Sequence, residues 1–290
     1  MLTRGLEAAS KGMQSLIEYQ DVIANNIANV NTTGFKRTTM AFKNLMDARV
    51  EQRPQDLERI GSTYRPVGTL SLGNGVDRTY MDFQQGTLNP TGSKLDIAIN
   101  GEGFFKMRYA NSLDQPNNNP NNYYYARNGH FHLTQDNYLV NYKGDYVTDT
   151  ENRRIRIVRD PDNPDNGPDN RINVQDDLLV GQNGVLQLTH PNYMRNLQRI
   201  AIIDFEDKTK VTSVGEGKFM AITGQDPKMY TKTSGFELSQ GNLESANVST
   251  VTEMIQSVNT SRTYETLAKM VKMQGDALSQ AIELGRVRIF

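Results

Sequence analysis

The sequence contains no cysteine and no tryptophan among its 290 residues. Without cysteine, disulfides, thiolate metal sites and cysteine nucleophiles are all excluded, and the fold is indifferent to the redox state of its compartment. Thirteen tyrosines and ten phenylalanines must therefore supply the aromatic part of any core. The chain is long enough for one large core or two modest ones.

Neither sign of charge is in excess, because the chain has 32 basic and 33 acidic residues. Such a chain is not drawn as a whole to nucleic acid or to an anionic membrane, and we expect neither partner. Small self-repulsion permits close packing of identical copies. No run approaches the roughly 18 apolar residues of a membrane span. Arg4 and Glu7 interrupt the apolar run of a secretory signal, so we predict no transmembrane segment and no cleavable signal peptide.

The N-terminal segment carries a narrow apolar stripe. Its members recur at alternating steps of four and three residues, with Gln20 filling one polar position: Leu2, Leu6, Ala9, Met13, Leu16, Ile23, Ile27 and Val30. A repeat of 3.5 residues is typical of a coiled-coil seam and predicts a helix over residues 3–30. Gly34 is expected to end this helix, because glycine tolerates the left-handed conformation of a C-terminal cap.

The C-terminal segment repeats the pattern. Its stripe contains Val251, Met254, Ile255, Val258, Tyr264, Leu267, Val271, Gln274, Leu278 and Ala281. Thr250 and Glu253 have the spacing of a capping box, which predicts where this helix begins. A helix that packs on a globular domain uses a broader face than a seam. We therefore expect the two termini to pair with each other or with neighbouring copies, and packing on the central domain is the alternative.

Residues 71–245 show the patterns of β structure. The alternation over residues 95–99 predicts a half-buried strand, followed by a turn at 100–103. Asn128-Gly129 predicts a hairpin between residues 123–127 and 130–133. Further turns are expected at 143–144 and 183–184, a buried strand at 200–203, and polar irregular loops at 108–122 and 159–170.

Three short features resemble active-site motifs, but each has a simpler interpretation. Gly101-Glu102-Gly103 lacks the third glycine of a dinucleotide motif and is followed by no helix pattern, so it predicts a tight turn. The aspartate-rich segment 160–169 departs from the calcium-loop pattern at several ligand positions. His130 and His132 would share one face of a strand but lack a third ligand. We predict a protein that is not an enzyme and holds no cofactor and no metal.

A longer pattern identifies a family. Residues 21–37 read DVIANNIANVNTTGFKR, a long signature of unusual composition. Three more segments follow in order: LDIAINGEGFF at 95–105, YARNGHF at 125–131 and GNLESANV at 241–248. Together they closely resemble the flagellar rod and hook axial protein family, over both ends and most of the middle.

The resemblance implies an α+β fold in which long N- and C-terminal helices pair as a coiled-coil-like stem beside a β-rich central domain. It assigns residues 1–35 and 246–290 to the helical core, 36–72 to a linker and 73–245 to the β-rich outer domain. The implied function is that of a structural subunit of the basal-body rod. Such subunits would self-assemble through head-to-tail contacts into a helical tube that transmits torque from motor to hook.

The resemblance also implies partners and a location. The partners are further copies of the chain, adjacent rod and hook proteins, and the flagellar export apparatus. The location is the flagellar basal body, reached by type III export without a cleavable signal. The long segment 47–72 favours the distal-rod type, with proximal-rod and hook types as alternatives. Two other classes stay open: a peptidoglycan-acting enzyme, although no acid pair stands out, and a coiled-coil adhesin, which would need a signal peptide.

The predicted assembly interface combines the seam with asparagines. Asn25, Asn26 and Asn29 are expected to hydrogen-bond between neighbouring helices and to fix their register. The full predicted set is Leu2, Leu6, Ala9, Met13, Leu16, Ile23, Asn25, Asn26, Ile27, Asn29, Val30, Val258, Tyr264, Leu267, Val271 and Leu278.

Overall fold

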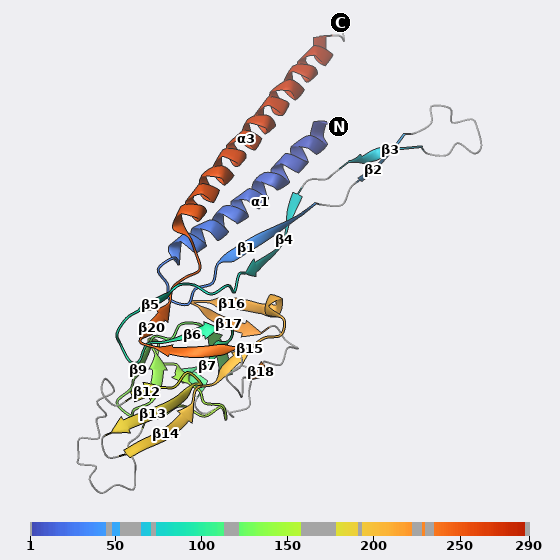
Figure 1. The fold of residues 1–290 in the computed structure, drawn as a ribbon. Coiled ribbons are helices and arrows are strands. Elements are labelled where there is room, and N and C mark those ends of the chain that lie inside the picture. Colours follow the sequence, from blue (N-terminus) through green and yellow to red (C-terminus); the bar gives the residue numbers. More distant parts are fainter. Residues whose placement is uncertain are drawn as a thin grey trace. The chain divides into compact units, whose positions relative to one another are not determined.

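The computed structural model describes residues 2–44, 48–52, 65–70, 74–112, 122–157, 178–190, 193–221, 228–229 and 235–287. The chain forms two compact units, each assembled from segments that are distant in the sequence. The helical unit comprises residues 1–28, 38–80 and 249–290, and the β unit comprises residues 29–37 and 81–248. Figure 1 labels the elements of both.

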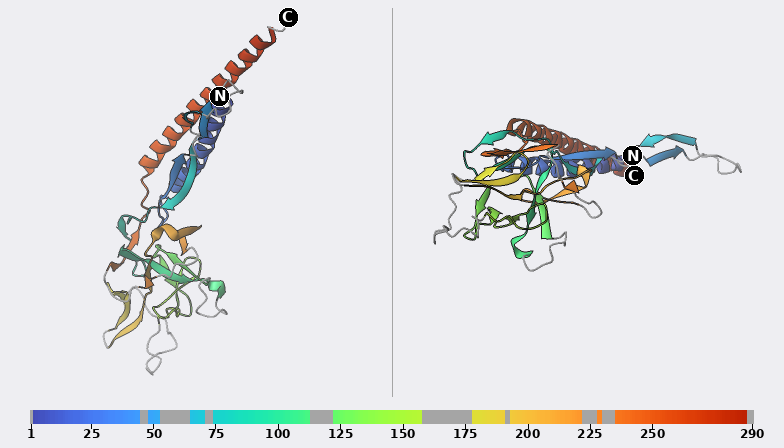
Figure 2. Two further views of the ribbon diagram at one scale, coloured as in Figure 1. Left: turned by 90° about the vertical axis from the view of Figure 1, so that its right-hand side faces the viewer. Right: turned by 60° about the horizontal axis from the view of Figure 1, so that its bottom comes forward.

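Two long helices dominate the helical unit. Helix α1 spans Leu2–Ala28 and helix α3 spans Thr250–Val287. They run antiparallel and side by side (Figures 1 and 2), because residues late in α1 contact residues early in α3. The described part of this unit also contains two strand pairs: β1 (Thr38–Asn44) with β4 (Asn74–Met81), and β2 (Ala48–Gln52) with β3 (Arg65–Leu70), the second pair antiparallel.

The structure confirms a helix at each end but corrects how each is bounded. α1 stops at Ala28, and the chain turns through a hydrogen bond from Thr32 N to Asn29 O, so Gly34 does not cap the helix. Ser249, not Thr250, precedes the first turn of α3, and its hydroxyl accepts a bond from Thr252 N at 3.4 Å. The capping-box prediction failed because the Glu253 side chain turns toward α1 instead of back to the cap.

The β unit is rich in short strands. Its described strands are β5 (Leu88–Pro90), β6 (Ile97–Gly101), β7 (Phe104–Arg108), β8 (Tyr123–Ala126), β9 (Phe131–Leu133), β10 (Leu139–Asn141), β11 (Tyr146–Val147), β12 (Leu178–Val180), β13 (Val185–His190), β14 (Tyr193–Arg199), β15 (Ile202–Asp204), β16 (Val211–Gly215), β17 (Lys218–Ala221), β18 (Lys228–Met229), β19 (Phe236–Gln240) and β20 (Asn242–Glu244). Among the described residues, the 3-10 turns η1 (Ala110–Ser112) and η3 (Lys208–Lys210) lie between these strands.

The main sheet has the strand order β16-β17-β8-β7-β11-β10-β9, with β15 joining β7 and β18. Three smaller sheets lie beside it within the described residues: β12-β13-β14, β6-β19 and β5-β20. Neighbouring residues of β7 point to opposite faces, as a strand requires. Phe105 therefore enters one buried apolar cluster with Ile97 and Leu139, while Phe104 enters a second with Phe205 and Phe219.

The predicted hairpin at Asn128-Gly129 is wrong. β8 pairs with β7 and β17, whereas β9 pairs with β10, so β8 and β9 are not hairpin partners. A type I′ turn needs positive φ at both central residues, and neither has it. Gly129 instead passes so close to β6 that an added Cβ would lie 1.7 Å from Ile97 O. The glycine is needed here for close backbone approach.

The prediction of a half-buried strand at residues 95–99 is also wrong, because both faces are covered. Asp96 and Ala98 are buried along with Ile97 and Ile99. Asp96 compensates by accepting hydrogen bonds from Thr91 Oγ1 at 2.5 Å and contacting His130 Nδ1 at 2.6 Å.

Other predicted turns are confirmed. Glycines with positive φ join β6 to β7, β10 to β11, and β12 to β13, at residues 101–103, 144 and 184. The buried strand predicted at residues 200–203 appears as β15 and the residues before it, all of them buried. Most of the loops at 108–122 and 159–170 lies outside the described residues.

A buried polar network links β8, β10 and β17 through Asp145, which lies in the turn before β11. Asp145 accepts bonds from Tyr124 Oη at 2.7 Å and from Lys218 Nζ at 3.1 Å, and Asn141 Nδ2 donates to Tyr124 Oη at 2.7 Å. Burial alone would raise the pKa of the Asp145 carboxyl. The hydrogen bonds from Tyr124, Ala110 N and Lys218 outweigh it and hold that pKa below its ordinary value.

We expect Asp145→Asn to destabilise the β unit at pH 7 by about 1–3 kcal/mol, because buried donors lose a charged acceptor. A depressed carboxyl pKa contributes stability that is present above the unfolded pKa and is lost as pH falls through the lower folded pKa. The deficit should therefore shrink below pH ~3.9. Urea unfolding at pH 7 and pH 3 measures this, with exposed Asp136→Asn as the control. A deficit independent of pH would contradict it.

Candidate assembly site

The seam between α1 and α3 is partly covered within one chain. Ile23 is 1% exposed and is the most deeply buried apolar residue of α1. Gly12 faces α3, since a Cβ there would lie in ordinary van der Waals contact with Leu267 at 3.6 Å. Gly5 lies in the same way against Gln274. The helices are antiparallel, so residues nearer the N-terminus of α1 contact residues later in α3. These contacts extend from the middle of both helices toward the N-terminal end of α1.

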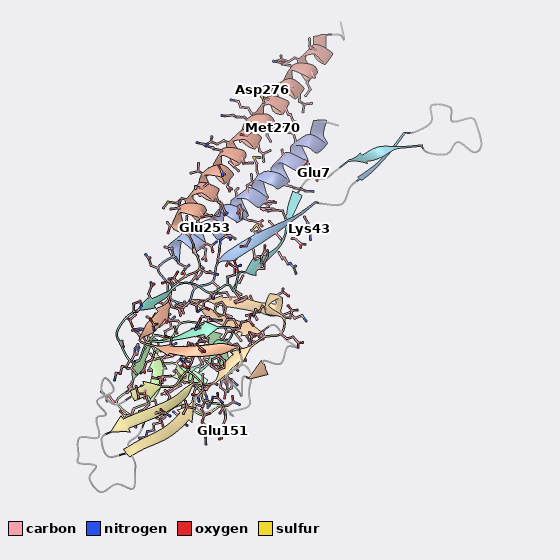
Figure 3. All side chains as sticks on the ribbon, viewed as in Figure 1. Glu7, Lys43, Glu151, Glu253, Met270 and Asp276 are labelled. Carbon is pink, nitrogen blue, oxygen red and sulfur yellow. The ribbon has the colours of Figure 1, made fainter. Side chains whose placement is uncertain are left out.

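One asparagine of the signature ties three elements of the helical unit together. Asn26 is 1% exposed, and its amide exchanges two hydrogen bonds with Thr38, donating to O at 2.8 Å and accepting from N at 2.9 Å. Its Nδ2 also donates to Glu253 Oε2 at 3.3 Å. The side chain therefore joins α1 to the start of β1 and to the first turn of α3, where Figure 3 labels Glu253.

Polar pairs continue the seam toward the N-terminus of α1. Tyr19 Oη donates to Gln256 Oε1 at 3.0 Å, and Gln20 Nε2 donates to Ser257 Oγ at 2.6 Å. Gln20 Oε1 is buried and accepts no hydrogen bond within the described residues. Polar pairs inside a seam fix which residues lie opposite each other, at a cost in stability.

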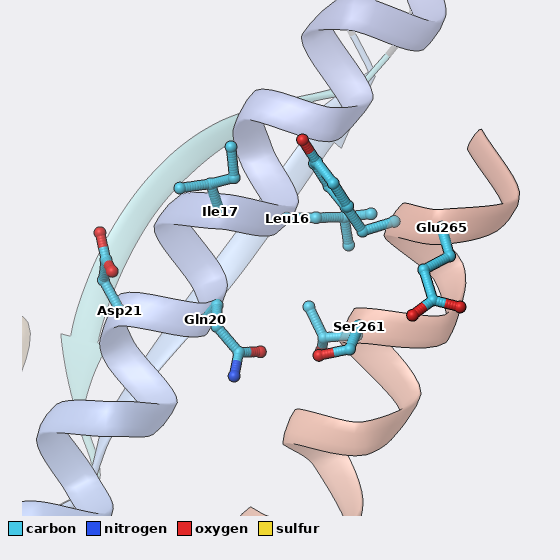
Figure 4. Close-up of a pocket in the computed structure, with 8 residues that line it drawn as sticks. Leu16, Ile17, Gln20, Asp21, Ser261 and Glu265 are labelled. Atoms are coloured by element: carbon cyan, nitrogen blue, oxygen red, sulfur yellow. The ribbon is translucent and has the colours of Figure 1, made fainter. Parts of the chain in front are cut away.

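A groove of about 410 Å³ opens between the helices next to these polar pairs (Figure 4). Its walls come from one turn of α1 and one of α3. The lining residues are Leu16, Ile17, Gln20, Asp21, Thr260, Ser261, Tyr264 and Glu265. The groove is therefore apolar in its middle and carries a carboxylate on each helix.

The structure brings most predicted interface residues to one seam but not all. Half-buried or buried on the facing sides are Leu6, Ala9, Met13, Leu16, Ile23, Asn26, Ile27, Leu267, Val271 and Leu278. Asn25 and Val258 are exposed, and Tyr264 is 38% exposed at the groove. Asn29 and Val30 lie beyond α1 in the β unit, and the side chain of Leu2 lies outside the described part.

The second half of the signature lies in the β unit and surrounds a buried ion cluster. Lys36 Nζ contacts Glu244 Oε1 at 2.7 Å, and Arg127 NH1 contacts Glu244 Oε2 at 3.2 Å. The three side chains are 1%, 0% and 4% exposed. Burial lowers the pKa of the Lys36 ammonium, and the Glu244 carboxylate opposes that shift.

Backbone bonds close the cluster. Lys36 Nζ donates to Gln84 O at 2.7 Å, Arg127 donates to Gly101 O at 2.8 Å, and Gly34 N donates to Glu244 O at 2.8 Å. Gly34 has φ +70°, and a Cβ there would lie 2.5 Å from Asn128 N. The Thr-Gly-Phe-Lys end of the signature is thus a packing site against the turn that contains Arg127.

Sequence reasoning missed Lys36, Arg127 and Glu244 as a group, because their separations of more than 90 residues give no local pattern. It also read Glu253 as a cap residue. A signal did exist: each of the three charged residues lies inside a segment that matched the family pattern, at 21–37, 125–131 and 241–248. Charged residues in such segments are candidates for buried ion pairs.

Within the described residues, no set of side chains is grouped as ligands for a catalytic metal ion. No group of three or more His, Asp or Glu side chains is placed to hold a metal ion there. His130 and His132 stack edge to face at 5.5 Å on the main sheet. Among the described helices, none has the length and apolar character needed to cross a bilayer.

Comparison with known proteins agrees with this architecture. Three family models match: "Flagella basal body rod protein" at residues 6–36, "Flagellar hook protein FlgE/F/G D1 domain" at 98–188, and "Flagellar basal body rod FlgEFG protein C-terminal" at 239–284. A basal-body rod protein FlgF of Caulobacter vibrioides is 31% identical over 268 residues, with 92% of each chain covered. The chain belongs to the flagellar basal-body rod protein family.

Other relatives from the rod family extend the match to the full length. A basal-body rod protein FlgG of Buchnera aphidicola is 30% identical over 272 residues, covering 91% of this chain and 93% of the relative. A FlgG of Borreliella burgdorferi is 28% identical over 294 residues, covering 98% and 100%. This rod-family chain is a structural subunit of the flagellar rod and not an enzyme.

Proposed function

We propose that this chain self-assembles into a helical, tubular section of the flagellar rod, of the distal type, that transmits torque from motor to hook. The observation that carries the proposal is the incomplete covering of α3. Val251, Met254, Ile255 and Val258 are 50–69% exposed although α3 is paired with α1. Large apolar residues left uncovered in a row are typical of an interaction surface.

We further propose that α1 and α3 form a coiled-coil-like stem that packs against the stems of neighbouring subunits. The 3.5-residue spacing and the polar pairs at Tyr19 and Gln20 support a fixed register. Adjacent rod and hook proteins and the flagellar export apparatus are the other proposed partners. Export would follow the type III route.

The direct test is purification of the intact chain, followed by sedimentation and electron microscopy across a concentration series. Self-assembly predicts filaments above a threshold concentration, and a chain that stays monomeric at every concentration contradicts it. Immunogold labelling of isolated basal bodies then separates distal from proximal placement. The proximal-rod type is the second candidate and the hook type the third.

Segment 47–72 is proposed to stiffen the distal rod. β2 and β3 pair antiparallel from Ala48 opposite Leu70 to Gln52 opposite Arg65, with a register shift between Val50 and Glu51. A paired hairpin resists bending more than a single-chain linker, in which added length costs little. Deleting residues 51–68 is therefore expected to give filaments that assemble but bend or supercoil like a hook.

The control for this deletion replaces residues 51–68 with a glycine-serine segment of the same length, which keeps the length but removes the pairing. It should bend as the deletion does. Cryo-EM measurement of filament curvature compares the two with the wild type. Straight filaments from the deletion variant would contradict both the stiffening role and the distal assignment.

A further inference from the structure

We propose that the groove between α1 and α3 receives the Met270 and Met273 face of a second copy of this chain. The inference rests on the proposed self-assembly and names one of its contacts. It follows from two surfaces on the same helix pair whose shapes and charges are complementary.

The groove fits an apolar side chain flanked by a cation. Ile17 is 51% exposed at its wall and Tyr264 is 38% exposed, so the middle of the groove is open and apolar. Asp21 and Glu265 put a carboxylate on either helix (Figure 4).

The matching surface lies further along α3. Met270 and Met273 are 44% and 61% exposed, one turn apart, and Figure 3 labels Met270 on this helix. Lys269 and Lys272 are exposed beside them. Methionine is flexible and fills irregular apolar hollows, while Lys272 offers a cation to the carboxylates at the groove. The row from Val251 to Val258 contains no lysine or arginine.

The two surfaces cannot meet within one chain. Met270 follows Ser261 by nine residues, and Met273 follows Tyr264 by nine. At about 1.5 Å per residue, nine residues place each methionine roughly 13 Å further along α3 than its groove residue, out of reach of the groove of its own chain. A contact between two different surfaces of identical subunits is head-to-tail and leaves both ends free to add further copies.

The first test is cysteine cross-linking, which the cysteine-free sequence makes specific. The variant Ile17→Cys with Met273→Cys is polymerised and oxidised, and basal bodies carrying it are treated likewise. We expect a ladder of covalent multimers on non-reducing gels. The control pair, Ile17→Cys with Ser279→Cys, should give at least tenfold less covalent multimer. Equal ladders, or an adduct whose mass is not a multiple of this chain, overturn the proposal.

The second test exchanges charges. Glu265→Lys and Lys272→Glu should each raise the threshold concentration for polymerisation roughly fivefold, and the double variant should return it to within about twofold. Glu283→Lys, an equal charge change at an exposed position further along α3, should have no such effect. If the wild-type chain polymerises but Glu265→Lys leaves the threshold concentration unchanged, this contact is wrong and the proposed function still stands. Absence of wild-type polymers and of the chain from basal bodies overturns both.

Discussion

Replacing Glu244 with glutamine is expected to destabilise the β unit by about 3–5 kcal/mol, since removal of one partner leaves buried cations uncompensated. Glu244 is the single carboxylate between Lys36 and Arg127, and it also accepts from Gly86 N at 2.9 Å. Glutamine keeps the shape but not the charge. Urea unfolding of the intact chain measures the loss, and exposed Glu237→Gln on β19 is the matched control. A loss below about 0.5 kcal/mol, the range of ordinary surface changes, would contradict the assignment.

The same variant should have a distinctive pH dependence. Without Glu244, the weaker attraction of Asp82 is left to oppose the effect of burial, so the pKa of Lys36 should fall further below its ordinary value of 10.5. Between that lowered pKa and 10.5, the unfolded chain binds more protons than the folded chain, so stability rises with pH. The deficit of Glu244→Gln should therefore shrink as the pH is raised toward 10. A double variant with Lys36→Met should be more stable than Glu244→Gln alone.

Replacing Ile23 with aspartate is the second change with a large expected effect. Ile23 is 1% exposed in the helical unit, and a buried carboxylate without a partner costs several kcal/mol. We expect α1 and α3 to lose protection from hydrogen exchange and the variant to form neither filaments nor motile flagella. The β unit should keep its protection, because its buried clusters lie in a separate compact unit.

Ala24→Asp is the matched control, since it adds the same charge one residue later on an exposed position of α1. It should retain the protection of both helices. Normal flagella built by Ile23→Asp would show that the N-terminal stripe is not required for assembly. Loss of protection throughout the β unit would contradict the independence of the two units.

The helices were predictable because their signal is local. A 3.5-residue repeat of apolar residues is legible from the sequence and identifies the seam on which Ile23 and Leu267 lie. Turns with a glycine at positive φ, such as Gly144 and Gly184, were predictable for the same reason. Each depends only on neighbouring residues.

The predictions that were wrong depended on contacts between residues that are distant in the sequence. Asn128-Gly129 has the composition of a hairpin turn, but distant strands compete for its flanking segments, and β8 pairs with β7 and β17 instead. Asp96 alternates as a surface residue would, yet His130 gives it a partner and allows burial. The ion cluster of Lys36, Arg127 and Glu244 depends on contacts across the β unit that no local pattern encodes.

The pairing of α1 with α3 has a consequence for biosynthesis. Tyr19 and Gln256 are bonded across 237 residues of sequence. A ribosome therefore releases α1 long before its partner exists, whereas most of the β unit comes from one stretch, residues 81–248, and can fold earlier. The seam of α1 stays without its partner helix through most of translation. Until the last turns of α3 are made, a chaperone must shield this stripe. Over the same period the segment is still extended enough to pass through a channel.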